Sequence, residues 1–120
     1  MVIFLQGEAW AARYQGVTLA ITAAAFGEAV TVALFFDPLR RWAEGRFDEG
    51  APGTAAAARV APLAETLDEA RRELGVRVVA CETAVRLAGQ DPAALRASLD
   101  GLESLPELWR RASAGRLVVI

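Results

Sequence analysis

Residues 76–89 read VRVVACETAVRLAG, and this stretch predicts the class of fold. Its first part, Val76–Ala80, is rich in the β-branched residues that buried strands favour. Its second part, Cys81–Gly89, has the composition of a helix and ends at a glycine, which is a common helix stop. A strand that leads directly into a helix is the repeating unit of α/β sheets. Cys81 is therefore expected at the carboxyl end of a strand and the amino end of a helix.

The same alternation extends in both directions from this stretch. Further strands are predicted at residues 2–5, 29–36 and 117–120, beside the one at 76–80, with a weaker fifth near 98–102. Helices are predicted at residues 9–26, 39–44, 62–74, 81–89, 92–99 and 105–115. Strands that alternate with helices form parallel sheets through right-handed crossovers. We therefore predict one domain over residues 1–120, a three-layer α/β/α fold with a parallel sheet of four or five strands.

Local signals mark several helix starts. Asp37-Pro38 and Asp91-Pro92 each combine a preferred N-cap residue with a proline at the first helical position. Ser104 and Glu107 have the spacing of a capping box. Residues 46–61 are rich in glycine, proline and alanine, and they form either a loose loop or, through their alanines, an extension of the next helix. We expect this segment to be the most mobile internal part of the chain.

The composition excludes several kinds of chemistry. All 13 basic residues are arginine, so no histidine base, Cys–His pair, lysine Schiff base or histidine-bound metal is available. The single cysteine excludes an internal disulfide and a thiolate zinc site within one chain. The net charge of -2 lacks the basic surface that nucleic-acid binding requires. We expect no metal, no other cofactor and no nucleic-acid partner.

One apolar stretch has the length of a membrane span. Residues 17–36 contain a single charged residue, Glu28, but Gly27 and Glu28 interrupt the stretch at its middle. An acidic side chain at the bilayer centre costs about 3 kcal/mol, so we predict a helix, a turn and a strand instead. Residues 1–5 lack the basic start of a signal peptide. With one cysteine in the chain, these features favour a reducing, cytoplasmic location and no membrane partner.

Cys81 has two interpretations that the sequence leaves open. The carboxyl ends of parallel strands are where open α/β sheets bind ligands, and a helix amino terminus favours an anionic sulfur. Cys81 is thus a candidate reactive thiol. Free cysteine is also among the most buried residue types, so Cys81 equally fits a small core residue.

The first three strands are expected to bring other residues to the same edge of the sheet. Gly7 is expected to let backbone N–H groups approach a ligand closely. Arg13 is the nearest counter-charge for a thiolate, although an exposed, solvated arginine is the favoured interpretation. Asp37 is better explained as an N-cap than as an acid catalyst. The residues expected to line this edge with Cys81 are Gln6, Gly7, Glu8, Arg13, Asp37, Glu82 and Thr83.

The order of these elements resembles that of a known family. The matching features are the long helix over 13–27 that runs into the strand 28–36, the strand Val76–Ala80 that ends at Cys81, and the closing helix and apolar strand. In this respect the chain resembles the DsrE/DsrF-like, YchN-type sulfur-relay family. The resemblance implies a five-stranded parallel sheet, assembly into homo-trimers or homo-hexamers, and a cysteine that carries sulfane sulfur as a persulfide.

Carried over to this sequence, the resemblance assigns the carrier role to Cys81 alone, with sulfur donor and acceptor proteins as partners. Whether the chain is an enzyme of the sulfurtransferase kind stays open. The alternative is a non-catalytic oligomeric binding or scaffold protein of the same fold, in which Cys81 is structural.

Overall fold

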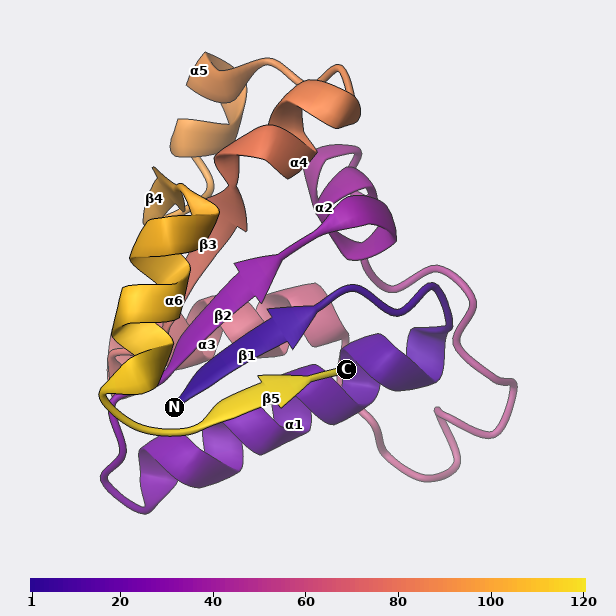
Figure 1. The fold of residues 1–120 in the computed structure, drawn as a ribbon. Helices are drawn as coiled ribbons and strands as arrows, with labels where there is room; N and C mark the ends of the chain where they lie inside the picture. Colours follow the sequence, from indigo (N-terminus) through magenta and orange to yellow (C-terminus); the bar gives the residue numbers. More distant parts are fainter.

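The computed structural model describes residues 1–120 and has a five-stranded, all-parallel sheet in the order β4-β3-β2-β1-β5. Figure 1 shows this sheet with the helices around it. The predicted α/β fold is confirmed. The elements in chain order are β1 (Val2–Leu5), α1 (Trp10–Ala25), β2 (Thr31–Leu34), α2 (Phe36–Ala43), α3 (Leu63–Leu74), β3 (Arg77–Cys81), α4 (Glu82–Leu87), α5 (Pro92–Arg96), β4 (Gly101–Glu103), α6 (Leu105–Ser113) and β5 (Leu117–Val119).

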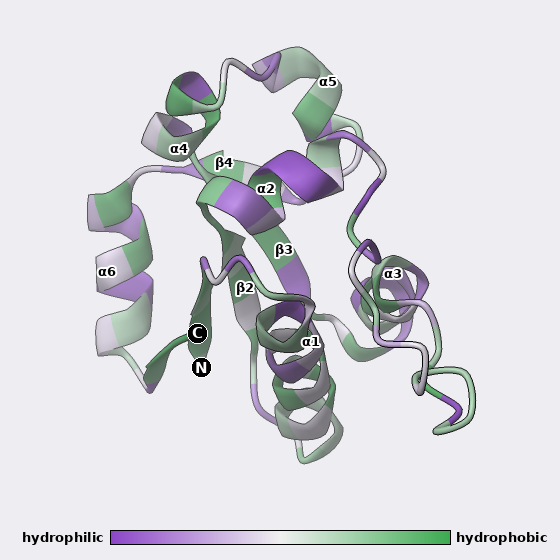
Figure 2. Ribbon diagram, turned by 90° about the vertical axis from the view of Figure 1, so that its right-hand side faces the viewer, coloured by the Kyte–Doolittle hydropathy of each residue, from purple (hydrophilic) through white to green (hydrophobic).

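The helices form two layers and a cap. Helices α1 and α3 lie on one face of the sheet, α6 lies on the other, and α2, α4 and α5 lie beyond the carboxyl ends of the strands (Figures 1 and 2). Strand β2 is buried along its whole length, as expected of a central parallel strand covered on both faces.

The α1 side of the sheet is closely packed. Leu5 of β1 contacts α1 at Gly16, where an added Cβ would lie only 3.1 Å from the Leu5 side chain. A larger residue than glycine would require the Leu5 side chain to shift. Leu5 is in register with Leu34 of β2, which is in register with Ala80 of β3, so these three residues share the face that α1 and α3 cover.

Several predicted boundaries shift by one to three residues. Strand β2 is shorter than the predicted 29–36, β3 includes Cys81, and α5 ends at Arg96 instead of residue 99. The weak fifth strand exists as β4, slightly later than expected. The predicted caps at Asp91 and Ser104 are confirmed. The Asp91 side chain accepts a hydrogen bond from the Ala93 N–H, and Ser104 forms the capping box with Glu107.

The stretch 17–36 is divided as predicted. Helix α1 ends at Ala25, and Gly27 adopts a φ of 90°, which allows the Glu28 N–H to reach back to the Ala23 carbonyl. Strand β2 then begins at Thr31. None of the helices combines the length and the apolar character needed to cross a bilayer.

Residues 46–61 form a loop without helix or strand, so their alanines do not extend α3, and the first part of the loop is firmly attached. The Phe47 side chain is buried, and the Asp48 carboxylate accepts hydrogen bonds from the N–H groups of Leu63 and Ala64. Asp48 thus caps the start of α3 from a distance in sequence. Most residues from Ala51 onward are exposed, and the mobility of this part remains a prediction.

Candidate functional site

Cys81 is the last residue of β3 and the N-cap of α4. The predicted position at a strand-to-helix junction is therefore correct. Because Ala80 shares the α1 face and side chains alternate along a strand, the Cys81 side chain points to the opposite face. The thiol makes no disulfide.

The structure buries Cys81 in the core. Only 5% of the residue is exposed, and it belongs to the main hydrophobic cluster together with Val79, Ala84 and Val85. None of the principal clefts of the surface is lined by Cys81. In the structure as it stands, a reagent in solution has little access to the sulfur.

An ion-pair cluster centred on the buried Glu103 of β4 lies beside Cys81. Glu103 is in register with Cys81 on the neighbouring strand, so the two side chains share a face. The Glu103 carboxylate accepts hydrogen bonds from the Arg77 guanidinium at 3.0 Å and from the Arg111 guanidinium at 2.6 Å. Two guanidinium groups therefore compensate the charge of the Glu103 carboxylate on the strand next to Cys81.

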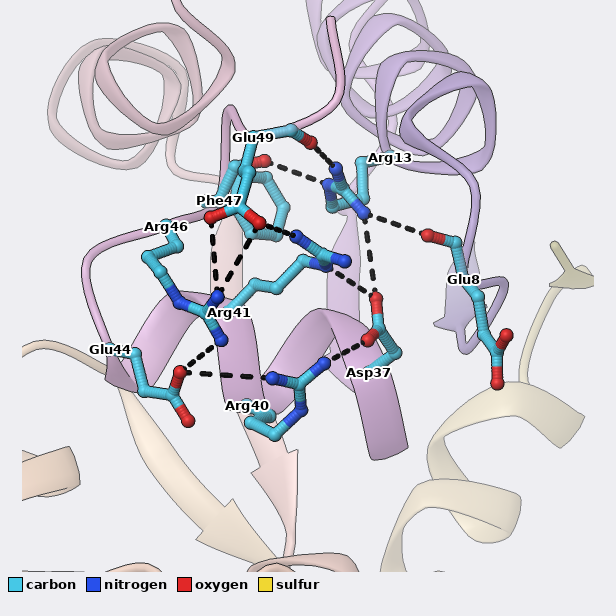
Figure 3. A network of polar contacts seen from close by, with 9 residues as sticks. All are labelled: Glu8, Arg13, Asp37, Arg40, Arg41, Glu44, Arg46, Phe47 and Glu49. Carbon is cyan, nitrogen blue, oxygen red and sulfur yellow. Dashed lines mark hydrogen bonds and ion pairs between the residues drawn. The ribbon is translucent and has the colours of Figure 1, made fainter.

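A second charged cluster lies at the carboxyl ends of β1 and β2, around Asp37 in the first turn of α2 (Figure 3). The Asp37 carboxylate accepts hydrogen bonds from Arg40 at 2.5 Å and from the Arg41 Nε at 2.7 Å. One of its oxygens also lies 3.6 Å from a guanidinium nitrogen of Arg13. Burial disfavours the charged carboxylate, but the hydrogen bonds from Arg41 and Arg40 outweigh it and lower the pKa of Asp37. Asp37 is thus an ionised partner of three arginines.

The interpretation of Asp37 as an N-cap is wrong. Helix α2 begins at Phe36, its N-cap is Phe35, and no side chain caps it. Cap preference is a local rule, whereas the Asp37 carboxylate is held by Arg13 of a different helix and by arginines later in α2.

The interpretation of Arg13 as an exposed arginine is also wrong, because only 1% of this residue is exposed. Its guanidinium donates to the backbone carbonyls of Phe47 at 2.8 Å, Glu8 at 3.1 Å and Glu49 (Figure 3). Burial, followed by repulsion from Arg41, lowers the pKa of Arg13, although an arginine remains charged. Through these hydrogen bonds Arg13 links the β1–α1 connection to residues 47–49. Its role is therefore structural.

Gly7 does not open a ligand site. The N–H groups of Gln6 and Gly7 both donate to the Ile120 carbonyl, at 2.8 and 3.0 Å. A Cβ on Gly7 would lie 2.6 Å from the Cβ of Ala12. The close approach that requires glycine is therefore made by α1 of the same chain, contrary to the expectation of a ligand.

The predicted edge residues separate into two groups. Cys81, Glu82 and Thr83 lie at β3, where the Thr83 hydroxyl accepts from Arg86. The remaining candidates lie at β1 and β2, around the Asp37 cluster, with Gln6 and Glu8 exposed. Because β2 separates β3 from β1, the residues that follow β1 start about 10 Å from β3 across the sheet, whereas Asp37 follows β2, the strand next to β3.

Two features of this edge escaped the sequence interpretation. Phe36 has a φ of 44°, which is rare for a bulky residue, and its side chain is 54% exposed between the strand and α2. The Arg77–Glu103–Arg111 cluster joins β3 to β4 and α6, and Arg77 and Glu103 are 26 residues apart in the sequence. The alternation of side chains along a strand would have predicted that Arg77 and Glu103 share a face of the sheet only if the register of β3 and β4 had been known.

We searched for known proteins similar to this chain: no family model matches it, and no curated protein matches it.

Proposed function

We propose that this chain is a sulfur-relay protein that accepts sulfane sulfur on Cys81 and passes it on, as its resemblance to the DsrE/DsrF-like family implies. The observation that carries the proposal is the position of Cys81 at the junction of β3 and α4. There the first N–H groups of α4 and its partial positive charge favour an anionic sulfur. The chain has no other thiol, so a persulfide on Cys81 cannot be resolved into an internal disulfide.

The reaction is a thiol exchange that needs no further oxidant. The Cys81 thiolate attacks the outer sulfur of a donor persulfide, a new S–S bond forms on Cys81, and the donor leaves as a thiolate. The acceptor thiolate then attacks the outer sulfur on Cys81 in the same way, which returns Cys81 to the thiolate. The implied partners are a sulfur donor protein and a sulfur acceptor protein.

The burial of Cys81 sets a condition on this exchange. A residue that is 5% exposed must become accessible, and α4, which covers the junction, is a helix of only six residues. Its Leu87 is 73% exposed and contributes little to holding the helix in place. We therefore include in the proposal a local opening of α4, at a free energy below that of global unfolding.

Assembly into a homo-trimer or homo-hexamer belongs to the same proposal. Leu105 and Trp109 lie one turn apart on α6 and are 51% and 63% exposed. Exposed tryptophan beside exposed leucine is typical of subunit contacts, where aromatic residues are enriched.

The second candidate function is a non-catalytic oligomeric binding or scaffold protein with a structural cysteine. The observation that favours it is the burial of Cys81 within the main hydrophobic cluster. Structural cysteines are buried and inert, whereas reactive ones are partly exposed in electropositive surroundings.

Thiol labelling of the native protein separates the two candidates. The relay predicts that iodoacetamide alkylates Cys81 at neutral pH without denaturant, at a rate that rises when α4 is loosened by Val85→Ala. The matched control, Leu95→Ala, removes a buried side chain from α5 and leaves α4 unchanged. Alkylation that occurs only at denaturant concentrations that unfold the whole chain would favour the structural cysteine.

A further inference from the structure

A cleft of about 290 Å³ lies between α1, α3 and residues 58–61, on the face of the sheet opposite to the Cys81 side chain. Figure 2 shows α1 and α3 on the same side of the sheet, with the connecting segment beside α3. The walls are mostly hydrophobic, with Val17 and Ile21 from α1, Val60 from the segment and Leu63 from α3. Apolar walls with a few polar groups are the usual character of small-molecule sites.

Arg59 is the one charged residue that lines this cleft. Its guanidinium has no hydrogen bond or ion pair within the protein, whereas Arg41, Arg71 and Arg111 are all paired with carboxylates. The hydroxyl of Tyr14, which also lines the cleft, has no protein partner either. The cleft therefore offers a free cation and a free hydroxyl to a molecule bound between apolar walls.

The backbone at Arg59 gives a second, independent indication. Residues 55–60 form a helical turn that ends in a Schellman motif, because Val60 N–H donates to the Ala55 carbonyl and Arg59 N–H to the Ala56 carbonyl, both at 3.0 Å. This places Arg59 at the left-handed position, with a φ of 58°. A side chain in that conformation is strained, and glycine is the usual residue there.

The chain uses glycine at its other left-handed helix ends. Gly27, Gly45, Gly75 and Gly89 follow α1, α2, α3 and α4, and all have positive φ. Arg59 is the exception among these positions. A residue that breaks a local rule and also lines a cleft with a free charge indicates a functional constraint.

We propose that the cleft binds a small amphipathic monocarboxylate, with its apolar body between α1 and α3 and its carboxylate on Arg59. A guanidinium can hold a carboxylate through two parallel hydrogen bonds, and no acidic residue lines the cleft to compete. Since a water molecule occupies about 30 Å³ in the liquid, the volume suits about ten non-hydrogen atoms. This site is independent of Cys81 and of the proposed relay.

Octanoate is a suitable probe, and octanol is its neutral analogue. With the full-length protein, titration of octanoate followed by two-dimensional NMR should shift the amide signals of residues 14–22 and 58–66 in a saturable manner. Arg59→Gln should weaken octanoate binding at least tenfold and leave octanol binding unchanged. Arg96→Gln, at another exposed and unpaired arginine, is the matched control and should bind octanoate as the wild type does.

A third variant tests the cleft separately from the charge. Thr18 lines the cleft from an exposed position on α1, so Thr18→Phe should fill the space without disturbing the fold and should abolish binding of both probes. The proposal is overturned if octanoate gives no saturable shifts, if the shifts lie outside these residues, or if Arg59→Gln binds octanoate as tightly as the wild type.

Discussion

Arg13 shows how a single buried residue connects separate parts of this chain. Its guanidinium reaches three backbone carbonyls and the Asp37 carboxylate, and so joins α1, the β1–α1 connection, the segment after α2, and α2 itself. The Phe47 ring lies against the same guanidinium, with 5.9 Å between the Arg13 Cζ and the ring centroid. The cluster is therefore explained by the fold, and a ligand is not required to account for it.

Removing this guanidinium should destabilise the protein. Arg13→Met keeps the apolar stem but leaves buried carbonyls without donors, and we expect a loss of about 3 kcal/mol in the free energy of unfolding. The change in the free energy of unfolding is measured by urea denaturation. The control Arg96→Met, at an exposed and unpaired arginine, should change stability by less than about 0.5 kcal/mol. Equal denaturation midpoints for the two variants would show that the hydrogen bonds of Arg13 do not stabilise the fold.

Asp37 should make stability depend on acidic pH. Its pKa in the folded protein is lowered, so its contribution is fully present above the unfolded pKa of about 3.9 and is lost as pH falls through the folded value. Asp37→Asn should therefore be less stable than wild type at pH 7. Denaturation midpoints measured between pH 7 and pH 2 should show this difference shrinking only below about pH 4. A difference that does not change with pH would mean that the charge of Asp37 is unimportant.

The ends of the helices show what the sequence can reveal about individual elements. Strand and helix order followed from apolar alternation and from glycine stops such as Gly27 and Gly75, because these signals depend on neighbouring residues. The confirmed caps at Asp91 and Ser104 are local for the same reason.

Non-local contacts explain where the sequence interpretation failed. Asp37 has the local pattern of a cap but is held by Arg13 of α1, and α3 is capped by Asp48 from 15 residues away. The turn at Phe36 was not predicted because a φ of 44° at a phenylalanine has no sequence signal. The position of Cys81 at the end of β3 could be predicted, whereas its burial depends on how α2, α4 and the sheet pack together.

The left-handed conformation of Arg59 should cost stability. Arg59→Gly relieves the left-handed strain of a side chain at the Schellman position, so we expect a gain of about 1 kcal/mol in the free energy of unfolding. Arg59→Gln keeps the strain and should leave stability near that of wild type. Thermal denaturation of both variants checks this, and a destabilised glycine variant would refute the assignment of strain.

The proposed function includes assembly of the chain into a homo-trimer or homo-hexamer. We expect sedimentation equilibrium at micromolar concentration to give three or six times the 12.8 kDa mass of one chain. Trp109→Glu should shift this mass toward the monomer, because it places a charge in the proposed apolar contact on α6. A wild-type protein that sediments as a monomer would contradict the proposed assembly.

Intact-mass measurement after sulfur loading decides whether Cys81 carries sulfane sulfur. The protein is incubated with a cysteine desulfurase and cysteine, freed of small molecules, and weighed. If Cys81 is the carrier, the wild type gains the mass of one sulfur atom and loses it to a thiol acceptor, whereas Cys81→Ser gains nothing. An unchanged wild-type mass, or an equal gain in Cys81→Ser, would contradict the relay and leave Cys81 as a structural residue of the core.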